Sequence, residues 1–400
     1  MEIYTLGAGF RRQDVIDDFY SVIWTERFYG DSEVELVVPL KQNLINKLAA
    51  GKFLAMDKSD EPMIIETFSI EDGQIKVMGI SLLSWLNNRF IRTSWNHRTQ
   101  VWNIKNQKAG EVLWIIVREM CTSQSSHLGN YDKFGVPNSG ELAIPNLKLD
   151  HQDTSGKKIN KVAVPYGPVY DALRKIAEQH KIGMKIWLQL TDASYNLRFR
   201  SYKGTDRTSR QEAHPTIRFS PIMDSFANVK ELRSTAEFKT LVYSFASGLE
   251  KLDTSDPDDH PDSWLQRDPG VARRSPDVGK YTGFELRAKM IMVDDFKIRF
   301  DLNKDDEIPA GSLSDERKEL ERILDDRANK ELRQNDRIQT VDGEVAPTNL
   351  FQYGKDYFLG DLIEVQGNTD KTEVSRVTEY IRTQDADGEK SYPTVEAVDP

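Results

Sequence analysis

Residues 353–365 read YGKDYFLGDLIEV and combine two glycines with a run of strand-forming residues. Glycine adopts the backbone conformations of tight turns at little steric cost. The apolar run Leu362, Ile363 and Val365 follows the second glycine, Gly360. We therefore interpret this stretch as glycine turns that lead into a β-strand near the end of the chain.

The two ends of the chain show the same order of strand and turn signals. In both, strand-like segments are followed by an Asp-Gly pair, which is a common hairpin turn. This repetition predicts a duplicated β-barrel unit. The matching segments are FLAMD (53–57), MIIETFSI (63–70) and QIKVMG (74–79) near the start, and FLGDLIEV (358–365), VSRVTEYI (374–381) and YPTVEA (392–397) near the end.

The region between the ends mixes helices and strands, so the expected fold class is α+β and β-rich. A hairpin is predicted over 19–39, around Tyr29-Gly30-Asp31. A helix is predicted to begin at Pro168 and to stop at Gly183. A long amphipathic helix is predicted over 312–334. Shorter helices are expected at 44–48, 80–90 and 110–120, and strands at 185–190, 196–202, 237–248 and 284–295.

The composition indicates a water-soluble globular protein of two to four domains. The chain has 400 residues, of which 38% are hydrophobic and 30% are charged. No apolar run is long enough to span a bilayer or to form the core of a signal peptide, so we expect no membrane insertion and folding in a cytoplasm. The net charge is -10 and no basic run dominates a segment, which argues against sequence-specific nucleic-acid binding.

Two stretches with glycines resemble nucleotide-binding loops, but each lacks a residue that such a loop requires. Gly7-Ala8-Gly9 has Arg12 where a dinucleotide loop needs its third glycine. Gly279-Lys280 has Tyr281 where a phosphate loop needs a serine or threonine. We therefore expect no nucleotide cofactor.

Metal and nucleophile signatures are equally weak. The six histidines occur singly, without metal-ligand spacing. Asp301, Asn303 and Asp305 match the start of a calcium loop, but Asp306 replaces its glycine, so a solvated acidic turn is the preferred interpretation. The single cysteine, Cys121, ends an apolar helix and is expected to be a buried small side chain. We therefore predict no catalytic, cofactor-binding or metal-binding residues. The histidines are His97, His127, His151, His180, His214 and His260.

A long polar loop over 250–280 is rich in Pro and Asp and cannot bury a core. Trp264 lies in it, and either recognises a ligand or anchors the loop to its own domain. The other six tryptophans lie in or near apolar segments, where a core or interface role is expected.

The order of these elements resembles the tail-hub (baseplate hub, tail-tip) proteins of siphophages over nearly the entire chain. The hairpin IWTERFYGDSEVELVVP, the strand pair MIIETFSIEDGQIKVMG, the helix-hairpin PVYDALRKIAEQHKIGMKIWLQ and the long helix carry the resemblance. Its most specific part is the motif formed by Tyr353, Gly354, Asp356, Tyr357, Gly360 and Asp361. In that motif Gly360 is expected to make the turn into the final barrel, and Asp361 to start its strand.

The resemblance implies a structural, non-enzymatic protein of the virion tail tip, assembled in the host cytoplasm. Its first and third domains are expected to be similar β-barrels, so that a homotrimer presents six barrels to a sixfold tail tube. Implied partners are tail-tube or distal-tail proteins, the tape-measure protein, and tip or receptor-binding proteins. The expected domains are 1–95 with 212–249 (first barrel), 96–211 with 301–345 (α+β, including the long helix), and 250–300 with 346–400 (second barrel).

Two other functions compete with this expectation. A tail-associated cell-wall hydrolase requires an acid/base pair or a zinc site. A carbohydrate-binding adhesin requires an exposed aromatic cleft, for which only Trp264 is a candidate.

Overall fold

The computed structural model forms two compact units, Met1–Glu231 with Val341–Pro400, and Leu232–Thr340. The three domains expected from the sequence divide the chain differently and stay a prediction. The residues described are 1–91, 101–122, 143–190, 195–246, 249–252, 281–293, 298–301, 310–335, 338–345, 350–367 and 372–398.

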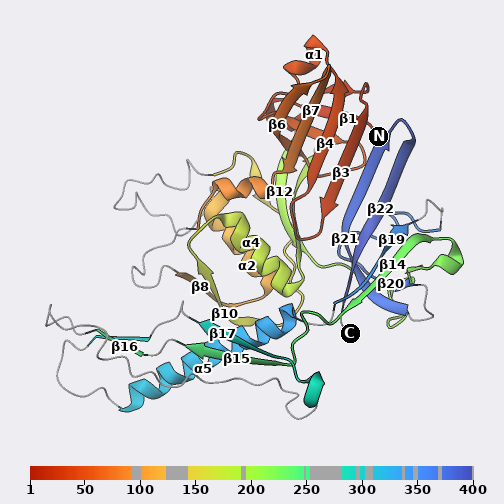
Figure 1. The fold of residues 1–400 in the computed structure, drawn as a ribbon. Helices are drawn as coiled ribbons and strands as arrows, with labels where there is room; N and C mark the ends of the chain where they lie inside the picture. The colour runs from red at the N-terminus through yellow and green to blue at the C-terminus, as the bar shows by residue number, and fades with distance from the viewer. Residues whose placement is uncertain are drawn as a thin grey trace. The chain divides into compact units, whose positions relative to one another are not determined.

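The first unit is built on one eleven-stranded sheet that joins both ends of the chain (Figure 1). The strand order is β13-β20-β21-β3-β4-β7-β6-β5-β1-β2, with β22 also paired to β21. The strands are β1 Ile3–Leu6, β2 Arg12–Ile16, β3 Ser21–Arg27, β4 Glu33–Pro39, β5 Phe53–Met56, β6 Met63–Glu71, β7 Gln74–Ser81, β13 Arg218–Phe219, β20 Leu362–Gln366, β21 Thr372–Asp385 and β22 Gly388–Ala397.

The hairpins predicted from turn residues are present. β3 and β4 pair antiparallel across the segment that contains Gly30. β6 and β7 pair antiparallel around Asp72 (φ 49°) and Gly73 (φ 74°). Positive φ at both central residues is the geometry of the turn that suits the twist of a two-residue hairpin.

The internal similarity of the two ends is also visible in the strand pairing. β5, β6 and β7 form an antiparallel meander, and so do β20, β21 and β22. In each meander the middle strand is bulged, between Ile65 and Thr67 in β6 and between Val377 and Glu379 in β21. A bulge bends its strand and raises the local twist, so the two meanders share a distinctive irregularity as well as an order.

The two meanders are not separate sheets, because β21 is long enough to serve both ends of the chain. Residues 372–376 of β21 pair with β20, whereas residues 379–384 pair with β3. The described pairings do not close either meander into a ring, so two independent barrels are not confirmed. The sequence predicted these strands, but it did not predict that β21 would pair with strands from both ends of the chain.

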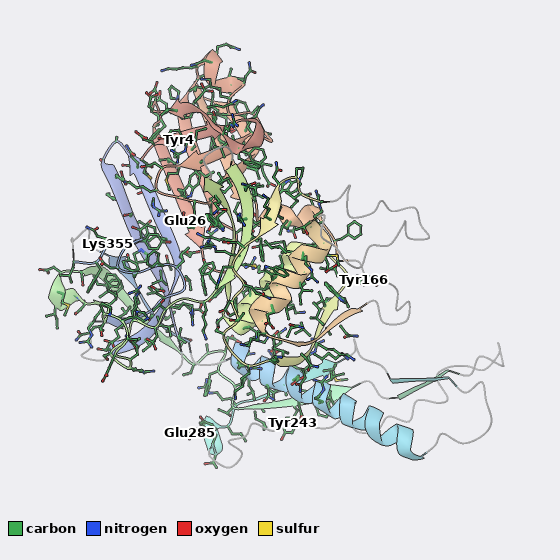
Figure 2. All side chains as sticks on the ribbon, turned by 180° about the vertical axis from the view of Figure 1, so that it is seen from behind. Tyr4, Glu26, Tyr166, Tyr243, Glu285 and Lys355 are labelled. Carbon is green, nitrogen blue, oxygen red and sulfur yellow. The ribbon has the colours of Figure 1, made fainter. Side chains whose placement is uncertain are left out.

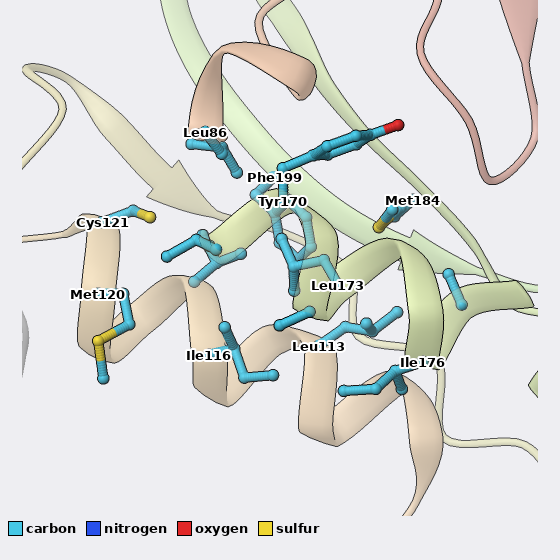
Figure 3. Packing of buried hydrophobic residues seen from close by; sticks show 14 of the residues in the cluster. Leu86, Leu113, Ile116, Met120, Cys121, Tyr170, Leu173, Ile176, Met184 and Phe199 are labelled. Atoms are coloured by element: carbon cyan, nitrogen blue, oxygen red, sulfur yellow. The ribbon is translucent and has the colours of Figure 1, made fainter. Parts of the chain in front are cut away.

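A helical layer completes the first unit. α2 (Ala109–Cys121) and α4 (Val169–His180) pack on each other, and their apolar faces meet side chains from β11 (Gly183–Leu190) and β12 (Tyr195–Tyr202), as Figure 3 shows. Smaller elements are β8 Val101–Gln107, β9 Leu147–Leu149, β10 Ile159–Pro165, β14 Phe226–Ser234, β19 Ile338–Val345, α1 Gln42–Ile45, and the 3₁₀ turns Ala8–Phe10, Ser84–Asn88 and Pro221–Met223.

Two expectations about these helices have different outcomes. Cys121 is fully buried, as expected, and burial raises the pKa of its thiol to about 12. The predicted stop of α4 at Gly183 is wrong. The helix ends earlier because Lys181 adopts a left-handed conformation (φ 54°, ψ 47°) and caps it, while Gly183 begins β11.

The second unit contains two parallel strand pairs and the long helix. β15 (Leu241–Ala246) pairs with β17 (Ala288–Val293), and β16 (Leu249–Leu252) with β18 (Ile298–Asp301). A 3₁₀ turn spans Gly283–Glu285. The predicted helix is present as α5 (Ala310–Gln334), and it packs mainly on β15. Residues 253–280 of the expected polar loop, with Trp264, and residues 302–309 of the candidate calcium loop lie outside the described residues.

The packing of α2 supports a direct test. Ile116 is fully buried in the core, whereas its neighbour Ile115 is only partly buried. We expect Ile116→Ala to lower the free energy of unfolding by about 2 to 5 kcal/mol, because it leaves a cavity in a close-packed interior. Ile115→Ala removes the same atoms and should cost clearly less in chemical denaturation. Equal losses would show that this face of α2 is not the buried one.

Candidate functional site

The motif singled out from the sequence folds into a tight, self-bonded loop in front of β20. The amide of Gly354 donates to the carbonyl of Tyr357 (2.9 Å), and Gly354 has a positive φ of 85°. The Asp356 carboxylate accepts from the amide of Gln352 (2.7 Å). The ring of Tyr353 stacks on Tyr380 of β21, with centroids 3.7 Å apart. The motif is therefore a structural unit fixed against β21.

Gly360 lies where three segments of the chain meet. Its φ is 88°, and a Cβ at this position would lie 2.2 Å from the ring of Phe28. A Cβ at Gly204 would lie 1.9 Å from the carbonyl of Gly360. Neither position has room for a side chain, so the backbones of these two loops touch directly beside Phe28. Glycine is required here for both conformation and space.

Asp361 fixes the same contact through hydrogen bonds. The carboxylate is buried and accepts from the amide of Thr205 (2.7 Å), from Nε of Arg207 (2.7 Å) and from the amide of Phe358 (3.0 Å). The sequence predicted that Asp361 starts the strand, but β20 begins one residue later, at Leu362. A buried carboxylate is tolerated only when such donors replace water.

A second carboxylate continues this pattern along β20. Glu364 accepts hydrogen bonds from the amide of Ser209 (2.8 Å) and from Nε of Arg218 (2.8 Å). Burial alone would raise the pKa of Glu364, but the donors from Ser209 and Arg218 hold it below its usual value. The carboxylates of Asp361 and Glu364 thus connect residues 205–218 to β20 through hydrogen bonds.

The junction is also attached to β21. The guanidinium of Arg376 donates to the carbonyl of Gly360 (2.6 Å) and lies 5.5 Å from the centre of the Phe28 ring. The amide of Gly360 donates to Val377, and the amide of Phe28 donates to Thr378 (2.8 Å). The residues around Gly360 therefore join β3, the loop at 204–207 and the C-terminal meander. We call this set the Gly360 junction: Phe28, Gly204, Thr205, Arg207, Gly360, Asp361 and Arg376.

Gly354 provides a matched control for Gly360, because both have positive φ but only Gly360 is enclosed. Gly354→Ala should cost about 1 kcal/mol, the usual penalty of this backbone region for a residue with a Cβ. Gly360→Ala should cost about 1 to 3 kcal/mol more, because the methyl group overlaps Phe28. Thermal and chemical denaturation of the two variants measure the difference. Equal losses would mean that the contact with Phe28 is not tight.

The first unit also contains a cluster of charged residues in which Glu26 on β3, Glu61 and Arg382 are buried (Figure 2 labels Glu26). Glu26 forms an ion pair with Arg382 of β21 (3.1 Å). Lys185 of β11 binds both carboxylate oxygens of Asp60 (2.7 and 2.9 Å). Glu61 is buried beside them. The cluster therefore contains three acidic residues, Glu26, Asp60 and Glu61, and two basic residues, Arg382 and Lys185. The sequence did not reveal this cluster, because its members come from four separate segments.

The excess acid changes the protonation of Glu61. Burial, together with the nearby Glu26 and Asp60, raises the pKa of Glu61 to about 8, and Lys185 opposes the shift only in part. Burial likewise raises the pKa of Tyr202 and Tyr353 in the same region. Enzymes that use general acid catalysis can have two neighbouring carboxylic acids, one of which is kept protonated. Both Glu26 and Glu61 are buried in this unit.

The shifted Glu61 has a measurable effect on stability. The pKa of Glu61 in the folded state is above its unfolded value of about 4.5. The stabilisation that protonated Glu61 contributes to folding is therefore complete below pH 4.5 and is lost as the pH rises towards 8. In that range the loss is about 1.4 kcal/mol per pH unit. Glu61→Gln stays neutral, and should flatten the pH profile of unfolding and raise stability at pH 8.

Glu66→Gln is the control for this prediction, because Glu66 is exposed on β6. It should leave the pH profile unchanged. If Glu61→Gln and Glu66→Gln give the same pH profile, Glu61 is ionised in the folded protein at neutral pH.

The other candidates from the sequence do not come together. His151, His180 and His214 are separate in the chain and among the residues described, whereas His97, His127 and His260 lie outside them. No group of three or more His, Cys, Asp or Glu side chains in the described ranges is arranged to hold a metal ion. Trp24 and Trp102 are buried, as a core role requires. No helix in the part of the chain described here is both long and apolar enough to cross a membrane.

Comparison with known proteins gives a family match and, among solved structures, similar folds of phage tail proteins. The family model described as Siphovirus ReqiPepy6 Gp37-like protein matches residues 1–251 and 309–395. The 43 kDa tail protein of prophage MuSo2 from Shewanella oneidensis has a TM-score of 0.53 at 11% identity, covering 99% of this chain and 98% of that one. The tail protein from Neisseria meningitidis MC58 has a TM-score of 0.51 at 13% identity, covering 100% and 96%. No curated protein sequence matches the chain.

Proposed function

Because the chain belongs to the family of siphovirus ReqiPepy6 Gp37-like proteins, we propose that it is the trimeric hub of a phage tail tip. The observation that carries the proposal is that the tail proteins from Shewanella oneidensis and Neisseria meningitidis are matched over nearly their whole length. The siphophage tail-tip resemblance found in the sequence is thereby confirmed for the family. A structural, non-enzymatic role in the tail agrees with it.

The duplicated meanders support a trimer. β5–β7 and β20–β22 share strand order and a bulged middle strand within one chain. Three chains would therefore present six similar meanders, which is the number that a sixfold tail tube offers as binding positions. In this arrangement the hub closes the tube and joins it to distal tip proteins.

The proposed domains and partners follow from the same arrangement. The two barrels would comprise 1–95 with 212–249 and 250–300 with 346–400, and the α+β domain 96–211 with 301–345. Tail-tube or distal-tail proteins would bind the sixfold face, and the tape-measure protein and tip or receptor-binding proteins are further partners. The protein would be assembled in the host cytoplasm and located at the tail tip of the virion.

Neither alternative function is favoured by a specific observation. A hydrolase could use an acid pair such as Glu26 and Glu61, but both side chains are buried. The adhesin depends on Trp264, which lies outside the described residues. The structural role therefore stands as the proposal.

The oligomeric state of the purified full-length chain tests the proposal. Light scattering should give three times the chain mass of 45.9 kDa. Electron-microscopy averages along the symmetry axis should show a threefold ring with a sixfold-like outline. A stable dimer, or a ring in which the meanders of the two chain ends occupy unrelated positions, would contradict it.

A further inference from the structure

Residues 57–62 connect β5 to β6 and lie against the edge of β11. The amide of Leu188 donates to the carbonyl of Asp60 (2.8 Å). The ammonium group of Lys185 binds both carboxylate oxygens of the same residue (2.7 and 2.9 Å). The two strands that flank the connection are paired with each other. The connection is therefore fixed at its ends by the sheet and in its middle by Asp60.

Ser59 and Glu61 bond the same connection to β3. The amide of Glu61 donates to the hydroxyl of Ser59 (3.2 Å), and that hydroxyl donates to the carboxylate of Glu26. Glu61 is only 3% exposed, whereas Asp60 is open to solvent. The connection thus joins β3 to β11, with one acid buried inside the joint and one at its surface.

The groups that surround Glu61 leave it without a base of its own. The charged and titratable side chains around it come from β3, β11, β12, β21, the loop before β20 and its own segment: Glu26, Lys185, Tyr202, Arg382, Tyr353 and Asp60. Each of the two bases in this set is bound to another acid, Lys185 to Asp60 and Arg382 to Glu26. Burial raises the pKa of both tyrosines, so they stay neutral. An ionised Glu61 is therefore a buried carboxylate without a cation, which is strongly unfavourable.

We propose that residues 57–62 act as a proton-controlled latch on the edge of β11. While Glu61 is protonated, the latch is closed and Asp60 holds Leu188 and Lys185. When Glu61 is ionised, water has to reach its carboxylate, and the latch opens by moving Asp60 away from β11. β5 and β6 remain paired, so the opening is local. The latch does not depend on the proposed trimer or on the role in the tail.

The pH range of the latch follows from the two states of Glu61. Burial raises the pKa of Glu61 to about 8 in the closed state, whereas hydration returns it towards its ordinary value of 4.5 in the open state. The ratio of open to closed forms therefore rises about tenfold per pH unit between pH 4.5 and 8, and stops rising above pH 8. Protonation closes the latch, and a rise in pH loosens it.

Hydrogen exchange at the amide of Leu188 measures the latch directly. After correction for the intrinsic exchange rate, its protection should fall about tenfold per pH unit between about pH 5 and 8 and stay constant above that range. Low urea concentrations should leave it unchanged, since local opening exposes little new surface. The amide of Val377, bonded to the carbonyl of Asp361 (3.0 Å), should be better protected and should lose protection as urea is added.

Two matched variants test the role of the buried acid. Glu61→Gln should abolish the pH dependence of protection at Leu188, because the new side chain does not ionise. Glu66→Gln should behave as the wild type, because Glu66 is exposed on β6. Both variants are measured by the same exchange experiment over the same pH range.

Asp60→Asn tests the charge balance itself, and it remains informative if Glu61→Gln does not fold. The substitution removes one acid and frees Lys185 to pair with Glu61. The closed state then tolerates an ionised Glu61, so Leu188 should lose clearly less protection between pH 5 and 8 than in the wild type.

Three results would overturn the latch. The first is a protection of Leu188 that does not change with pH, or that changes equally in the wild type and in Glu61→Gln. The second is a parallel loss of protection at Leu188 and Val377 with urea, because the edge of β11 would then open only when the whole unit unfolds. The third is a wild-type pH profile in Asp60→Asn, since Lys185 would then play no part in the charge of Glu61. None of these results depends on whether the chain is a trimer.

Discussion

The direct backbone contact between Gly204 and Gly360, closed by the ring of Phe28, is the constraint on which the first unit depends. It brings together strands that are far apart in the sequence, and it tolerates no side chain at either glycine. The Asp361 carboxylate and the Arg376 guanidinium then replace water around the contact with protein donors and acceptors.

The cost of burying charge is compensated differently at the Gly360 junction and in the cluster around Glu61. At the Gly360 junction, the carboxylate of Asp361 is matched by several donors, so its burial is compensated. In the cluster of Glu26, Asp60 and Glu61, acids outnumber bases, and neutralisation of Glu61 takes the place of a missing cation. Buried ion pairs specify geometry more than they stabilise it, so the cluster is better viewed as fixing the alignment of β3 with β11 and β21.

Local signals in the sequence predicted the local structure well. The Asp72-Gly73 hairpin, the turn at Gly360 and the long helix follow from turn chemistry and apolar spacing, which act over a few residues. The sharing of β21 between two partners and the Glu61 cluster depend on contacts between distant segments. No local pattern encodes such contacts, so a single sequence gave no means of finding them.

The pairing of β3 with β21 also has a consequence for synthesis. Arg27 and Glu379, which form an ion pair across these strands (2.6 Å), are separated by 352 residues. At a ribosome speed of about 5 to 20 residues per second, the edge of β3 waits roughly 20 to 70 s for its neighbour to be made. During that interval the nascent N-terminal sheet has a free edge that can pair with another chain. The β3 edge of this sheet is thus completed only after β21 has been synthesised.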